Sequence, residues 1–311
     1  MNRITATVFA AALVSFGVRA ETASAAQQQD FSQAQIKTTD LGNRTYLLEN
    51  WNGNAQMGGN MVAVVGDDGV IMVDGNFAPM HPKIKAAVAS VSSQPIRYVV
   101  NTHFHGDHSG GNTPFAADGA TVVAHQNVKT RLAAGTVNGL TGNRAEPIPE
   151  AGQPKQVYTD QTSLQVRGRT ARLGHPANAH TDGDSYVHLA DANVLVTGDI
   201  VTFGRYPNID FANGGNINGM VAAVDTYIQV SNDTTKVVPG HGPLGTKAML
   251  RDYRTVLANA RDRVQRLIAE GKTIDEAVAA KPNADSDTRF NMNEMQAGNF
   301  VRVVYRSLKP N

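Results

Sequence analysis

The feature that most restricts the fold is a run of metal-binding side chains directly after a predicted buried strand. The strand is expected at Ile96–Val100, and the next eight residues read Asn-Thr-His-Phe-His-Gly-Asp-His. In an extended segment at a strand end, His103 and His105 point to the same side, whereas Asp107 and His108 face a neighbouring position. Imidazole and carboxylate groups are ligands that zinc accepts. The run therefore predicts two adjacent metal positions at the end of a strand.

Two ions need more ligands than this run provides, and the chain contains no cysteine. Disulfides, thiolate metal sites and a cysteine nucleophile are therefore excluded. Three further candidates each follow a strand-like apolar run and lie in a turn of small residues, namely His180, Asp199 and His241. Strand ends are common positions for ligands on a rigid scaffold, so we expect these residues to complete the site.

Composition restricts the class of protein and its partners. The 311 residues are 41% apolar and 18% charged, which excludes a disordered tail, a collagen-like repeat and a coiled coil. The formal net charge of +1 offers no broad attraction for nucleic acid. Beyond residue 25, no stretch has the roughly 18 uncharged apolar residues of a membrane span. We therefore expect a small-molecule substrate and no nucleic-acid partner, and the oligomeric state stays open.

The first 25 residues are typical of a signal peptide. Arg3 precedes a short apolar stretch at Ile4–Val18, and Ala23-Ser24-Ala25 forms a small-residue cleavage pattern. A second possible cut follows Ala20, and a frayed N-terminal helix is the alternative. We expect a periplasmic or secreted protein with a disordered lead-in at residues 26–36 and one catalytic domain, with C-terminal helices, at residues 37–311.

Short runs rich in β-branched residues end at Gly, Asn or Asp, as strands do. The expected strands are Thr45–Leu48, Met61–Val65, Val70–Val73, Ile96–Val100, Thr121–Ala124, Ser185–Leu189, Val194–Thr197 and Lys236–Val238. Helical patterns are found at His81–Val91, Asn127–Ala134, Met220–Val230 and, most clearly, Lys247–Glu270. Strands occur in pairs before helices, which favours a mixed, layered α/β protein over a strictly alternating array.

Four motifs in order, HFHGDH, HTDGD, GDI and VPGHG, resemble those of the metallo-β-lactamase superfamily of binuclear metallohydrolases. The resemblance runs from about residue 40 to residue 245. It implies an αβ/βα four-layer sandwich, with two central mixed sheets, flanking helices and a metal cleft at one edge. It also implies two zinc ions, although the native metal is left open.

The resemblance assigns a role to each candidate ligand. The first zinc would be held by His103, His105 and His180, and the second by Asp107, His108 and His241, with Asp199 bridging. Asp74, in Val73-Asp74-Gly75, matches the family's first motif and is expected to orient a ligand by a hydrogen bond.

We expect a hydroxide shared by the two zinc ions to attack a carbonyl, with Asp107 orienting it and passing its proton onward. Export favours a β-lactamase-like enzyme that opens a cyclic amide. The best-known zinc β-lactamases have Cys or Ser at the position of Asp199, whereas an Asp there resembles lactonases and thioester hydrolases, so one of these is the alternative. A non-catalytic metal-binding protein is the remote alternative.

Several other residues have weaker assignments. Tyr206 and Tyr186 are candidates for a lactonase tyrosine, and His175 for the cleft wall. We expect His81, His125 and His188 to be structural, while Asp182 and Asp184 either bond to ligands or cap turns. The Gly/Asn-rich segment Trp51–Asn60 is either a mobile flap or a solvent loop with Trp51 in the core, and the loop Asn213–Asn216 is a candidate for the opposite wall.

Overall fold

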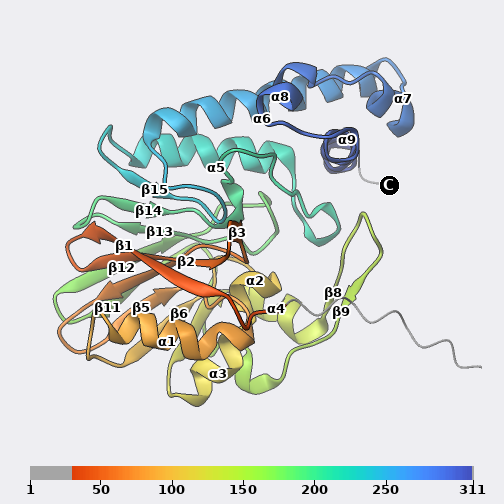
Figure 1. The fold of residues 1–311 in the computed structure, drawn as a ribbon. Coiled ribbons are helices and arrows are strands. Elements are labelled where there is room, and N and C mark those ends of the chain that lie inside the picture. The colour runs from red at the N-terminus through yellow and green to blue at the C-terminus, as the bar shows by residue number, and fades with distance from the viewer. Residues whose placement is uncertain (1–29, 310–311) are drawn as a thin grey trace, which may run out of the picture. The chain divides into compact units, whose positions relative to one another are not determined.

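Two β-sheets pack face to face in the structure, a computed structural model that describes residues 30–309 (Figure 1). Within these residues the larger sheet has the order β1-β2-β4-β5-β6-β7-β10, with β3 paired to β2. Pairing is antiparallel from β1 to β5 and parallel from β5 to β10. The strands are β1 (Gln35–Gly42), β2 (Thr45–Asn52), β3 (Ala55–Gln56), β4 (Met61–Val65), β5 (Val70–Val73), β6 (Ile96–Val100), β7 (Thr121–His125) and β10 (Gln156–Tyr158).

The smaller sheet has the order β11-β12-β13-β14-β15 and is antiparallel except for the final pair, β14 and β15. Its strands are β11 (Gln161–Val166), β12 (Arg169–Gly174), β13 (Tyr186–Leu189), β14 (Val194–Val196) and β15 (Lys236–Val238). A separate short hairpin pairs β8 (Thr136–Val137) with β9 (Arg144–Ala145). Both main sheets are therefore mixed.

Helices cover the outer face of each sheet (Figure 1). The larger sheet packs against α1 (His81–Ala89) and α3 (Asn112–Ala117), and the smaller sheet lies under α5 (Ile217–Val230) and α6 (Lys247–Ala269). The remaining helices are α2 (Gly106–Ser109), α4 (Gln126–Ala134), α7 (Ile274–Ala279), α8 (Ala284–Arg289) and α9 (Glu294–Leu308). Short 3₁₀ turns lie at Ala78–Met80, Glu150–Gly152, Gly198–Ile200 and Phe211–Asn213. The αβ/βα sandwich expected from the sequence is confirmed.

Strand β4 shows why the layers form. Val62 and Val64 point into the core between the sheets, whereas Met61, Ala63 and Val65 point toward the helices on the outer face. Alternate residues of a strand face opposite sides of the sheet, so a strand covered on both sides is apolar throughout. This double burial explains why β4 and β5 were recognisable as uninterrupted apolar runs.

The predicted lead-in extends too far along the chain. The strand β1 already begins at Gln35, the Phe31 ring packs 5.2 Å from the Phe77 ring, and Lys83 Nζ donates to the carbonyls of Phe31, Ser32 and Ala34. Because of these contacts, residues 31–36 belong to the compact unit Phe31–Asn311 and are not part of a disordered lead-in. The predicted signal peptide, residues 1–25, lies outside the described residues. Within residues 30–309, no helix has the length and apolar character needed to cross a membrane.

Candidate metal centre

The seven predicted ligands come from strand ends of both sheets. His103 and His105 follow β6 of the larger sheet, and α2 then carries Asp107 and His108. The smaller sheet contributes His180 between β12 and β13, Asp199 after β14 and His241 after β15. The structure brings all seven together. Their potential ligand atoms form three overlapping sets of three, and the atoms of each set lie within 4.8 Å of one another. For description we divide the seven residues into two groups.

The first group consists of three imidazoles. Nδ1 of His105 lies 3.1 Å from Nε2 of His103 and 3.0 Å from Nε2 of His180. Zinc–nitrogen bonds of about 2.0–2.1 Å in tetrahedral geometry separate neighbouring donor atoms by roughly 3.3 Å. Three nitrogens at this spacing suit one cation.

The second group consists of the remaining four residues, the carboxylates of Asp107 and Asp199 and the imidazoles of His108 and His241. Nε2 of His241 lies 3.1 Å from Oδ2 of Asp107, and Nε2 of His108 lies 3.1 Å from Oδ1 of Asp199. The other oxygen of Asp199, Oδ2, lies 3.9 Å from Nε2 of His180 in the first group. The Asp199 carboxylate therefore lies between the two groups, as a bridging ligand would.

Two buried atoms at this centre have no hydrogen-bond partner among the described residues. They are Nε2 of His108 and Oδ1 of Asp199, which face each other at 3.1 Å without hydrogen-bond geometry. Buried polar atoms are almost always paired, and a cation between these two would satisfy both. The donor set therefore fits a divalent metal, and the ligand roles of the individual residues stay predictions.

The imidazoles of the first group are held by groups on their outer sides. Nε2 of His105 lies 2.9 Å from Oδ2 of Asp210, whose two carboxylate oxygens also accept from Nδ2 of Asn213. Nδ1 of His180 lies 2.8 Å from the Asn208 carbonyl. Such partners fix the tautomer and orientation of metal-binding histidines. Sequence reasoning missed Asp210, although the Asn213–Asn216 loop beside it was singled out.

Asp74 makes the corresponding contact with His108, and its role in orienting a metal ligand stays a prediction. Its Oδ2 lies 2.8 Å from Nδ1 of His108, while Oδ1 accepts from the Thr102 backbone N–H. The Thr102 hydroxyl also donates to Oδ2. One buried carboxylate thus orients His108 and fixes the start of the loop that carries His103.

Burial and neighbouring charges give the two groups opposite proton affinities. Burial, with the nearby His108, His180 and His105 rings, lowers the pKa of His103 well below its ordinary value, and burial lowers the pKa of His180 to about 4. Burial also opposes a charge on His241, but the Asp199 and Asp107 carboxylates outweigh it and raise its pKa to about 9. At neutral pH the His103 and His180 imidazoles are therefore uncharged, whereas the His241 imidazole carries a proton that pairs with the Asp199 and Asp107 carboxylates until a cation replaces it.

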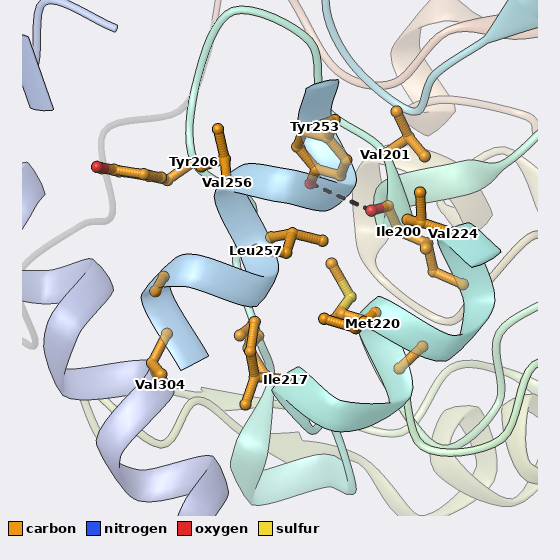
Figure 2. Packing of buried hydrophobic residues seen from close by; sticks show 14 of the residues in the cluster. Ile200, Val201, Tyr206, Ile217, Met220, Val224, Tyr253, Val256, Leu257 and Val304 are labelled. Atoms are coloured by element: carbon orange, nitrogen blue, oxygen red, sulfur yellow. Dashed lines mark hydrogen bonds between the residues drawn. The ribbon is translucent and has the colours of Figure 1, made fainter. Parts of the chain in front are cut away.

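Asp199 is anchored by the core beneath it. The residues after it, Ile200 and Val201, enter the cluster between the smaller sheet and helices α5, α6 and α9 (Figure 2). The Tyr253 hydroxyl donates to the Ile200 carbonyl at 3.2 Å (Figure 2). On the other side, Gly198 has φ +54°, and a Cβ there would lie 2.8 Å from the Thr102 side chain. Only glycine permits the turn and this close approach between the two sheets.

Both candidate tyrosines face away from the metal centre. The Tyr206 hydroxyl donates to Asp287 at 2.7 Å, and its ring stacks on the Phe300 ring. The Tyr186 ring packs 5.4 Å from the Tyr227 ring in the interior. The geometry gives neither one a part in the chemistry.

The remaining histidines and acids have structural contacts. His125 caps α4 and stacks on His175 with ring centroids 3.7 Å apart, and His81 pairs with Asp118. Asp182 pairs with Arg131. Asp184 caps its turn, because Oδ2 accepts from the backbone N–H groups of His180 and Thr181, and burial raises its pKa to about 7.

Comparison with known proteins identifies a family. The profile described as the Metallo-beta-lactamase superfamily matches residues 55–241, more than half of the chain. A hydroxyacylglutathione hydrolase of Polaromonas sp. is 28% identical over 193 residues, covering 61% of this chain and 64% of the relative. A type 2 metallo-beta-lactamase of Bacillus sp. is 22% identical over 185 residues, covering 58% of this chain and 66% of the relative. The match thus spans slightly less than two thirds of each relative's own length.

Solved structures share the fold. A metallo-beta-lactamase from Pontibacter korlensis superimposes with a TM-score of 0.57 at 20% sequence identity, covering 72% of this chain and all 100% of that chain. At this identity the likeness concerns the fold.

Proposed function

This chain belongs to the metallo-beta-lactamase superfamily, and we propose that it is a metal-dependent hydrolase that cleaves a bond at a carbonyl carbon. The observation that carries the proposal is the convergence of seven imidazole and carboxylate groups, with the Asp199 carboxylate between the two sets. The cofactor is proposed to be two zinc ions, the first held by His103, His105 and His180 and the second by Asp107, His108 and His241.

When bound, two such cations supply Lewis acidity that makes water nucleophilic at neutral pH and polarises a carbonyl oxygen. The chain's own residues provide orientation and proton transfer. Asp107 and His105 are 24% and 25% exposed, whereas His103, His108 and His180 are buried. Substrate therefore approaches on the side of Asp107 and His105. The Asp107 carboxylate, whose pKa is held at about 2 by His108 and His241 against the effect of burial, is ionised and accepts a proton from the attacking water.

The substrate class proposed first is a cyclic amide, as in β-lactam antibiotics. It is supported by the related type 2 metallo-beta-lactamase and by the exported location that the N-terminal sequence predicts. A thioester is the second candidate, favoured by a carboxylate at position 199 and by the related hydroxyacylglutathione hydrolase.

A substrate panel tests the proposal. Zinc-loaded protein would be offered nitrocefin, a homoserine lactone and a glutathione thioester, with the expectation that nitrocefin is hydrolysed. EDTA and Asp107→Ala should abolish turnover, whereas Asp225→Ala, at an exposed ion pair with Arg254, should not. Preference for the thioester would establish the second candidate. Two bound zinc ions without turnover of any compound would overturn the proposal in favour of a metal-binding protein.

We extend the proposal to the location of the protein, which we place in the periplasm or outside the cell. Support comes from Arg3, the apolar stretch Ile4–Val18 and the small residues at positions 23–25. Intact-mass measurement of protein from a periplasmic fraction should show cleavage after Ala25 or Ala20. Full-length protein confined to the cytoplasm would contradict export.

A further inference from the structure

We propose that the segment Gln56–Asn60, at the junction of β3 and β4, is a positioning element for the second metal position, formed by Asp107, His108 and His241. The inference rests on the proposed function, because it assigns residues that hold the ligands of that centre. The sequence left this segment open between a mobile flap and a solvent loop. Its contacts indicate a rigid support instead.

Asn60 holds the loop that carries His241 on both sides of the histidine. It is 1% exposed, and its Nδ2 donates to the carbonyls of Pro239 and Gly242, each at 3.0 Å. Its backbone N–H donates to the Gly240 carbonyl at 2.7 Å. Three bonds from one residue thus fix the carbonyls that flank His241, and with them the direction of its ring.

Gln56 completes this clamp. Its Oε1 accepts from the Gly242 N–H at 3.0 Å, and its Nε2 donates to Oδ1 of Asn60 at 2.6 Å. Because Oδ1 of Asn60 is occupied by this donor, Nδ2 of Asn60 is held facing the two carbonyls. The side chains of Gln56 and Asn60 therefore act as a pair.

Gly59 provides the contact with the other two ligands. Its N–H donates to the Asp107 carbonyl at 3.2 Å, and a Cβ at Gly59 would lie only 2.6 Å from Nε2 of His108. Behind it, the buried Asn76 amide donates to the carbonyls of Met57 and Gly59. The segment thus touches Asp107 through its backbone, His108 through close packing and His241 through its flanking carbonyls.

The first test is the isosteric substitution Asn60→Asp. It replaces the Nδ2 donor by an oxygen that faces two carbonyl oxygens, while the acceptor for Gln56 remains. Partners that orient metal ligands typically contribute about 10–100-fold to metal affinity, so we expect a loss of that size for one of two zinc ions. The matched control is Asn193→Asp, because Nδ2 of Asn193 likewise donates to two oxygens, those of Asn232 and Thr234, in the turn before β14.

Zinc titration against a competing chelator gives the affinities, and anomalous diffraction at limiting zinc shows which position is empty. We expect low occupancy at His241 and full occupancy at His103, and we expect excess zinc to restore turnover. A merely structural role would lower both occupancies, or lower thermal stability without rescue by zinc. Gln56→Ala should weaken the same position, and its effect should be non-additive with that of Asn60→Asp.

A second variant tests the close packing at Gly59. Gly59→Ala should displace the His108 ring and lower zinc affinity at the second position. Gly298→Ala, in α9, is the control for zinc stoichiometry, because a Cβ there would lie 3.2 Å from Cγ1 of Val278, in a contact between α9 and α7.

The outcomes separate this inference from the proposed function. Wild-type affinities in Asn60→Asp and Gly59→Ala, with wild-type protein that binds two zinc ions and hydrolyses the panel, would overturn the positioning role alone. Wild-type protein that binds fewer than two zinc ions, or that turns over nothing, would overturn the proposed function itself.

Discussion

The Asp74 carboxylate lies 2.8 Å from Nδ1 of His108, and both side chains are almost completely buried. A carboxylate acceptor at Nδ1 keeps a proton on that nitrogen and leaves Nε2 to face Asp199 and a cation. The arrangement fixes the orientation of the His108 ring, and it determines which nitrogen keeps its proton when a cation binds.

Asp74→Asn tests this arrangement without changing the shape of the side chain. Asp74 has φ +63°, a conformation that Asn also tolerates. The new amide can donate to Nδ1 of His108 and so move the ring proton to Nε2, which then faces the metal position. We expect zinc affinity at the second position to fall by about 10–100-fold, measured by chelator competition. Unchanged affinity would show that Asp74 acts only by holding the Thr102 backbone.

Asp210→Asn is the corresponding change at the first position. The variant removes the charge 2.9 Å from Nε2 of His105 and places an amide where Asn213 already donates. We expect zinc to bind more weakly to the group His103, His105 and His180, while the second position keeps its affinity. Asp225→Asn, at an exposed pair with Arg254, is the control. Equal weakening of both positions would indicate a general loss of structure.

Two buried tyrosines give a matched test of the core behind Asp199. Tyr253 donates to the Ile200 carbonyl, whereas the Tyr227 hydroxyl has no hydrogen-bond partner among the described residues. Tyr253→Phe should lower the free energy of unfolding by about 1–2 kcal/mol, because it leaves a buried carbonyl unpaired. Tyr227→Phe should be neutral or stabilising. Urea unfolding of both variants checks the difference, and equal effects would contradict it.

His125 should make stability depend on pH. Burial and the stacked His175 ring lower its pKa to about 4 against the attraction of Asp160 and Asp182, so the unfolded chain binds this proton more readily. The free energy of unfolding should therefore be complete above pH 6.5 and decrease as the pH falls toward 4, by about 1–2 kcal/mol from this group.

His125→Asn keeps the helix-capping acceptor for the Asn127 N–H but removes the titration. Urea unfolding at pH 7 and pH 5, with the same metal content throughout, should show a smaller decrease in this variant. An identical decrease would assign the pH dependence to other groups.

The strands β4 and β5 were predicted with their observed bounds because they are buried on both faces and are apolar throughout. The strands β11 and β12 were missed because one face of each is exposed and polar side chains interrupt the pattern. The helix Lys247–Ala269 was found within one residue of its observed end, since its buried face repeats over six turns.

At the metal centre, the sequence indicated which residues come together because each follows a strand and carries a chemically distinctive side chain. It did not indicate Asp210 or Asn60. Asp210 lies 105 positions from His105 and Asn60 lies 179 positions from Pro239, and neither belongs to a metal-binding motif. Their importance follows from tertiary contacts alone, which local patterns do not encode.

Each of the three sets of potential ligands draws two members from the segment after β6 and one from the smaller sheet, which contributes His180, Asp199 and His241 in turn. Neither half of the sandwich alone supplies a complete set of these ligands. Cations bound here would cross-link the two sheets, so chelation should lower the denaturant concentration at which the protein unfolds. The metal centre would then also hold the two sheets in their relative position.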